Sequence, residues 1–191
     1  MKEDFLFERV GRMDAINSFV SEEALFLHRE YLNTLKLKYS VIEKSIPQIQ
    51  NMSVRDIVKK RNLRYKDEII ALRSDILCHE LFFDSFSDKY QSSEAVRKAY
   101  RTEASFIYEL LEMGKEGNLK FLVVCIEGGV VGVRGLCEAS QIMKIANPML
   151  CIDLCEHSYF LDYGFSKEKY LLNLLPHLKL SVLDDFLNNR H

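Results

Sequence analysis

Apolar residues recur at three- and four-residue steps in two segments of the first half of the chain. The first segment predicts an amphipathic helix that begins after Ser21, a good N-cap, with Glu22 and Glu23 near the positive helix end. The second segment, residues 67–86, carries a similar stripe. Two such helices facing each other form an α-hairpin. The inward stripes are Leu25, His28, Leu32, Leu35 and Tyr39 in the first helix, and Leu72, Ile76, His79, Phe83 and Phe86 in the second.

The second half of the chain has a different pattern. A helical segment from Ser93 to about Met113 precedes a turn, after which two β-branched runs flank the pair Gly128-Gly129, as in a β-hairpin. A third strand is expected at about 149–153, and the C-terminal segment is helical around Pro176. Residues 41–62 include Pro47 and are expected to form a connection with a short helix. The first two strands are expected at residues 119–126 and 130–136, and the C-terminal helical segment at residues 167–188.

The most informative chemistry lies after the third predicted strand. The apolar run Pro148–Ile152 ends in Asp153, and His157 follows four residues later. A carboxylate at a strand end and an imidazole one turn on can bind one metal ion, and this pair suits iron or manganese. Taken alone, His28 or His79 is more often a hydrogen-bonded core residue. Four buried polar groups without a shared partner would be costly, so a metal ion is the simplest explanation for the set.

These residues carry a resemblance to the iron/manganese superoxide dismutases. The segment Asp153–Tyr163 resembles the family's C-terminal metal signature, Asp-x-Trp-Glu-His-Ala-Tyr-Tyr. The segment Cys78–Phe83 is similar to its Asn-His-x-x-Phe-Trp motif, and residues 12–28 resemble the N-terminal segment that ends in the first His ligand. Matches in order cover roughly residues 12–182. The resemblance implies an α+β fold, with an N-terminal helical hairpin in residues 1–90 and an α/β lobe with a three-stranded antiparallel sheet in residues 91–191.

The resemblance also implies a site and an activity. His28, His79, Asp153 and His157 would hold one Mn or Fe ion per chain, and the reaction would be disproportionation of superoxide to dioxygen and hydrogen peroxide. In the family, the Glu at the place of Glu156 reaches across a dimer interface to the partner's ligand His, which implies a homodimer. Tyr159 continues the motif and is expected beside the ligands.

Two catalytic positions differ from the family pattern. Lys36 stands where the family has its gating Tyr, and it could attract a small anion or be an ordinary exposed helix residue. Glu138 falls on the Gln of the manganese-type members, and it could contact metal-bound solvent or be a loop residue at the surface. The iron-type alternative for that Gln is Asp75. The chain has no Trp, whereas the family packs several around the metal, at positions that here are Phe83, Leu119, Phe121 and Cys155.

Composition excludes several classes of protein. With 191 residues, 48% hydrophobic and 28% charged, and a net charge of −2, the chain is an ordinary globular protein with no general attraction to nucleic acid or anionic membranes. No apolar run approaches the length of a membrane span, and the start of the chain lacks a signal-type or transit-type pattern. A cytoplasmic location is expected, with a mitochondrial one not excluded. The five Cys residues are expected to be reduced.

A second function is compatible with the same residues. Relatives of this family serve as subunits of mitochondrial ribosomes, so the chain could be a structural or interaction protein on this fold. The absent Trp residues, Lys36 and Glu138 favour that alternative. The intact ligand set and the Glu156-His157 pair favour the enzyme, because a scaffold does not need them.

Overall fold

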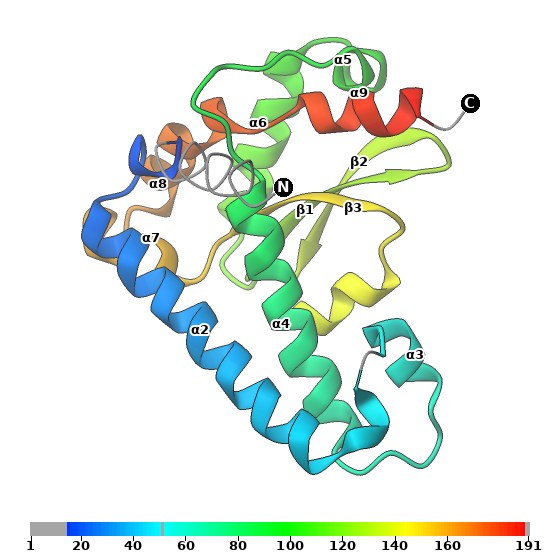
Figure 1. Cartoon of the computed structure of the whole chain (residues 1–191). Coiled ribbons are helices and arrows are strands. Elements are labelled where there is room, and N and C mark those ends of the chain that lie inside the picture. Colours follow the sequence, from blue (N-terminus) through cyan, green and yellow to red (C-terminus); the bar gives the residue numbers. More distant parts are fainter. Residues whose placement is uncertain (1–14, 51, 190–191) are drawn as a thin grey trace, which may run out of the picture.

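The computed structural model describes residues 15–50 and 52–189, and Figure 1 shows its arrangement of helices around one small sheet. Residues 12–14, where the family resemblance begins, lie outside this part. So does the start of the chain, on which the expectation about a signal or transit sequence depends. In chain order the elements are α2 (Glu22–Ser45), η1 (Pro47–Ile49), α3 (Val54–Lys59), α4 (Lys66–Asp84), α5 (Glu94–Tyr100), α6 (Glu103–Gly114), β1 (Phe121–Glu127), β2 (Val130–Leu136), η2 (Ala139–Lys144), β3 (Pro148–Asp153), α7 (Glu156–Tyr163), α8 (Lys167–Leu174), η3 (Leu175–His177) and α9 (Ser181–Asn188).

Helices α2 and α4 form the predicted hairpin and lie side by side (Figure 1). Ser21 caps α2 by accepting a hydrogen bond from the backbone N–H of Ala24 at 3.1 Å. The helix continues to Ser45, further than the sequence indicated, and ends just before Pro47, which cannot continue it. A separate apolar cluster fills the far end of the hairpin, formed by Leu32, Leu35, Tyr39, Ile49, Ile57, Ile69 and Ile76.

The sheet has the strand order β2-β1-β3, and both pairings are antiparallel. The turn between β1 and β2 is made by Gly128 and Gly129, with φ of 59° and 83°, a region that glycine enters without steric cost. Central strand β1 is buried along nearly its whole length. Because β1 pairs with β3 so that Phe121 lies opposite Asp153, the end of β3 is fixed against the middle strand.

The helix expected over residues 93–113 is in fact two helices, α5 and α6. The chain turns at Arg101, whose φ of 68° is incompatible with a continuous right-handed helix. Thr102 then caps α6 by accepting from the backbone N–H of Ser105 at 3.0 Å. The C-terminal segment is likewise divided, because η3 around Pro176 separates α8 from α9.

The predicted fold class is confirmed. One main core joins the start of α2 and the inner face of α4 to the sheet and the C-terminal helices. The expected division near residue 90 stays a prediction, and so does the cytoplasmic location. Among the helices of the described residues, none is both long and apolar enough to cross a lipid bilayer. The five cysteines are free thiols.

Candidate metal centre

Four elements, from three regions far apart in the sequence, bring the predicted ligand residues together. His28 lies on the inner face of α2 and His79 on the facing surface of α4, and both are buried. Asp153 is the last residue of β3, and His157 lies in the first turn of α7. Helix α2 packs against both α4 and α7, and α4 packs against β3, so these elements converge at one end of the hairpin (Figure 1).

The side-chain atoms of this cluster converge on one carboxylate oxygen. Oδ2 of Asp153 lies 3.2 Å from Nε2 of His28, 3.2 Å from Nε2 of His79 and 3.0 Å from Nε2 of His157. One ligand atom from each of these four residues lies within 4.8 Å of the others. Three imidazole nitrogens and one carboxylate oxygen at this separation can bind a single ion.

The cluster has an unsatisfied polar atom, which fits a metal ion. Nε2 of His28 is buried and makes no hydrogen bond with acceptable geometry, although Asp153 Oδ2 is near it. A buried polar atom without a partner is costly. This nitrogen faces a group of nitrogen and oxygen atoms of the kind that iron and manganese accept as ligands. The residues present therefore fit such an ion.

Burial and hydrogen bonding set the charges of the cluster without metal. Burial opposes ionisation of Asp153, but the three imidazoles close to its Oδ2 outweigh burial and hold the pKa of this carboxyl well below its usual range. Burial also lowers the pKa of His28. For His79, burial is outweighed by hydrogen bonds to Asp153 and Asp75, which raise its pKa to about 10. The metal-free cluster is thus an aspartate balanced by the positive charge of His79.

Neighbouring groups fix the orientation of these side chains. Nδ1 of His79 donates to the backbone carbonyl of Asp75 at 2.8 Å, which directs Nε2 at the cluster. Oδ1 of Asp153 accepts from the backbone N–H of Cys155 at 2.8 Å. The hydroxyl of buried Tyr170 donates to the backbone carbonyl of Asp153 at 3.2 Å. The rings of Phe82, Phe83 and Phe121 pack around His28 and His79, with centroids 4.9–5.6 Å away.

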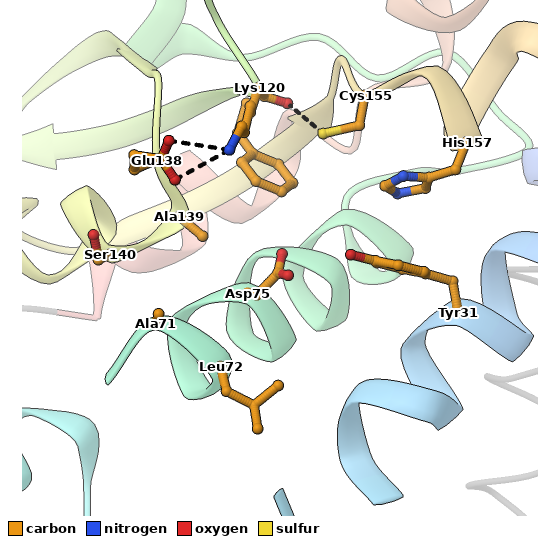
Figure 2. Close-up of a pocket in the computed structure, with 11 residues that line it drawn as sticks. Tyr31, Ala71, Leu72, Asp75, Lys120, Glu138, Ala139, Ser140, Cys155 and His157 are labelled. Carbon is orange, nitrogen blue, oxygen red and sulfur yellow. Dashed lines mark hydrogen bonds and ion pairs between the residues drawn. The ribbon is translucent and has the colours of Figure 1, made fainter. Parts of the chain in front are cut away.

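A cavity of about 400 Å³ opens beside the cluster, and Figure 2 shows its lining. Tyr31 and His157 form one wall, and the ring of Tyr31 stacks on that of His157 with centroids 4.3 Å apart. Burial and the nearby Asp75 raise the pKa of Tyr31 to about 12, so its hydroxyl keeps its proton at neutral pH. His157 is the one partly exposed member of the cluster, with 30% of its side chain accessible.

Glu138 lies at the opposite end of this cavity from His157 (Figure 2). Both its carboxylate oxygens lie 3.1 Å from Nζ of Lys120, and its side chain is 66% exposed. It also closes a capping box with Gln141 at the start of η2. Its expected contact with the metal site therefore stays a prediction. The exposed Lys36 side chain forms an ion pair with Glu80 at 2.8 Å.

The two residues expected beside His157 differ in their exposure to solvent. Glu156 is exposed, where a partner chain could reach it. Tyr159 is buried and stacks on Tyr170 with centroids 5.2 Å apart, so it supports Asp153 indirectly through the Tyr170 hydroxyl. Sequence reasoning did not identify Tyr170 or Lys120. Neither lies next to a ligand in the sequence, and no local pattern signals its position.

Comparison with known proteins agrees with this geometry. The chain matches the family model for iron/manganese superoxide dismutases, C-terminal domain, over residues 82–184, more than half its length. It therefore belongs to the iron/manganese superoxide dismutase family, and the resemblance found in the sequence is confirmed. The chain is also similar to the superoxide dismutase (Fe) of Cupriavidus metallidurans, with 25% identity over 162 residues that cover 80% of each protein.

Proposed function

We propose that the protein is a superoxide dismutase that uses one Fe or Mn ion per chain, bound by His28, His79, Asp153 and His157. The reaction converts two superoxide anions and two protons to dioxygen and hydrogen peroxide. A bound ion would supply one-electron chemistry by alternating between its trivalent and divalent states. Family membership and the convergence of four ligand atoms, one of them lacking a hydrogen bond, support the proposal.

The chain's own residues have distinct parts in this proposal. Asp153 contributes the negative charge that offsets a multivalent ion, and its low pKa keeps it ionised. The backbone acceptor at Asp75 keeps the Nε2 lone pair of His79 directed at the ion. The phenylalanine rings around the imidazoles exclude water from the buried side, so access is limited to the side of Tyr31 and His157.

Superoxide would approach through the cavity beside His157. Lys120 lines the cavity, but its charge is offset by Glu138. Lys36 would be a second cation that attracts superoxide, and its ion pair with Glu80 weakens this attraction. Glu138 would then affect catalysis through its negative charge at the cavity. The alternative is that Glu138 contacts solvent bound to the metal.

We further propose that the protein is a homodimer bridged by Glu156. Helix α7 and the following loop expose large apolar side chains next to this residue: Phe160 is 45% exposed, Leu161 52% and Phe165 89%. A second copy that covers this face would bury these groups and let Glu156 accept from the partner's ligand imidazole.

The alternative is a structural or interaction protein on the same fold, such as a ribosome-associated subunit. The absence of Trp from the chain favours it, because the family packs several Trp residues around its metal. Such a protein has no need of four convergent ligands, which is why we favour the enzyme.

The deciding experiment is superoxide decay measured with protein of known metal content. The loaded wild-type protein should accelerate decay in proportion to its Fe or Mn content, whereas the Asp153→Asn variant should lose metal and activity together. A protein that binds the metal fully and leaves superoxide decay unchanged would favour the structural alternative.

A further inference from the structure

Residues 59–66, which lead from the end of α3 into α4, are the most basic stretch of the chain. In a chain whose net charge is −2, these eight residues include no acid. Their five cations are Lys59, Lys60, Arg61, Arg64 and Lys66. The net charge of the whole chain therefore conceals a local excess of positive charge, and we call residues 59–66 the basic segment.

The charges of the basic segment are mostly not neutralised within the molecule. Among the described residues, Lys60, Arg61 and Lys66 form no ion pair. Two acids, Asp67 and Glu68, follow in the first turn of α4, where the positive end of that helix offsets part of their charge. A cluster of unpaired surface cations attracts a polyanion.

Ordered structure holds the basic segment in place. Ile57 is fully buried in the apolar cluster at the far end of the hairpin, which anchors α3. Ser53 caps α3 by accepting a hydrogen bond from the backbone N–H of Asp56 at 3.1 Å. Arg55 donates to the backbone carbonyl of Ile145 at 3.4 Å, beside the end of η2. A segment fixed in this way loses less conformational freedom when it binds a partner.

Tyr65 lies among these cations with its side chain 52% exposed. Its φ of 56° and ψ of 28° are left-handed, a conformation that is uncommon for a residue other than glycine and that occurs often at binding sites. The guanidinium carbon of Arg64 lies 4.5 Å from the centroid of the Tyr65 ring. An exposed aromatic ring among unpaired cations is the combination with which proteins hold single-stranded nucleic acid, because bases stack on the ring while phosphates contact the cations.

We propose that the basic segment binds single-stranded nucleic acid, with its Lys and Arg side chains on the phosphates and the Tyr65 ring stacked on a base. A lipid surface fits less well, because such binding uses several apolar side chains that insert beside the charges. In residues 54–66 the exposed large apolar side chains are Val58 and Tyr65 alone.

This binding surface is separate from the metal centre. Figure 1 shows α3 at the end of the hairpin away from α7. Along α4, Lys66 is about 20 Å from His79 at 1.5 Å per residue. The inference therefore does not depend on the metal site, nor on the choice between an enzyme and a structural protein.

The first test is fluorescence anisotropy with short labelled oligouridylate and oligothymidylate. Both should bind, because phosphates and bases are common to the two. If all five cations contact phosphates, the logarithm of the affinity should fall with the logarithm of salt concentration with a slope of about −3.5. The combined variant Lys60→Ala/Arg61→Ala/Arg64→Ala should reduce the size of this slope by about 2 and the affinity at about 0.1 M salt by about 100-fold.

A matched variant controls for the change in net charge. The combined variant Lys89→Ala/Lys98→Ala/Lys169→Ala removes three exposed lysines outside the basic segment and should bind both oligonucleotides like the wild-type protein. Both combined variants change exposed side chains and should keep the metal content of the wild-type protein.

The second test concerns the ring of Tyr65. Tyr65→Leu removes the aromatic face and should weaken binding by about tenfold with an unchanged salt slope. Tyr65→Phe keeps the ring and should bind like the wild-type protein.

Four results would overturn the inference. The first is no binding of the wild-type protein to either oligonucleotide at low salt, and the second is an equal loss of binding in the control variant. The third is tighter binding to a duplex of the same length, since paired bases do not stack on a side chain. The fourth is binding to phosphatidylserine vesicles that is lost with the basic segment while oligonucleotide binding is kept, which would assign the segment to a lipid surface.

Discussion

The ring of Tyr31 lies over the ring of His157, with centroids 4.3 Å apart and an angle of 28° between the planes. His157 is the member of the cluster with the most accessible side chain. The stack covers one face of its imidazole, so helix α2 contributes both a proposed ligand, His28, and the cover for another proposed ligand.

Removing this cover should weaken metal binding. Tyr31→Ala is expected to weaken it by about tenfold, the lower end of the effect of groups that orient metal ligands. Tyr31→Phe keeps the stacked ring and should bind metal like the wild-type protein. Competition with a chelator measures the metal affinity of each variant. Equal affinities for Tyr31→Ala and the wild-type protein would show that the stack does not position His157.

Neutralising Glu138 should increase the rate of reaction with superoxide. Glu138→Gln leaves Lys120 unpaired at the cavity, so an anionic substrate is attracted more strongly, and the gain should decrease with added salt. Glu127→Gln is the matched control, because it frees Arg134 on the β-hairpin outside the residues that line the cavity. Superoxide decay measured across ionic strength is the test, and identical salt profiles for Glu138→Gln and wild type would refute this role.

Metal binding should release protons near neutral pH. Burial lowers the pKa of His79, but its hydrogen bonds to Asp153 and Asp75 raise it to about 10 in the metal-free protein. The ion must then displace the Nε2 proton, so metal affinity should increase with pH up to about 10, by at most about tenfold per pH unit. The raised pKa of His79 also stabilises the metal-free fold. This stabilisation is fully present below the pKa of an unfolded His, about 6.5. It is lost as the pH rises through the pKa of His79 in the folded protein, about 10.

Calorimetric titration in buffers with different ionisation enthalpies measures the released protons directly. A heat of metal binding that is the same in every buffer would mean that no proton is displaced, contrary to the positive charge assigned to His79.

Assembly should depend on Glu156. Glu156→Ala is expected to shift the protein from dimer to monomer in sedimentation at micromolar concentration, because the bridge to the partner's imidazole is lost. Glu168→Ala changes another exposed glutamate, in the next helix α8, and should remain dimeric. A wild-type protein that sediments as a monomer would contradict both the bridge and the dimer.

The helices and the residues of the cluster were predictable because their signals are local. His28 and His79 each continue an apolar stripe at helical spacing, and Asp153 ends an apolar run typical of a strand. The break at Arg101 was not predictable, because its positive φ is imposed by the packing of α5 and α6 rather than by a glycine or proline. For the same reason one helix was expected where two occur.

The environment of Glu138 was not predictable from the sequence either. Its partner Lys120 is 18 residues away and meets it only because the residue before β1 lies beside the turn after β2. The support of Asp153 by Tyr170 likewise depends on the packing of α8 against the site, 17 residues further along the chain. Sequence spacing identifies candidate ligands on regular elements, whereas tertiary contacts determine which residues surround them.

The central claim is that these four side chains bind one redox metal ion. Anomalous X-ray scattering from crystals of the purified protein, measured at the iron and manganese absorption edges, tests this most directly. We predict one peak per chain, between Nε2 of His28, His79 and His157 and the carboxylate of Asp153. Full density for these side chains without a peak between them, in protein supplied with both metals, would contradict the claim.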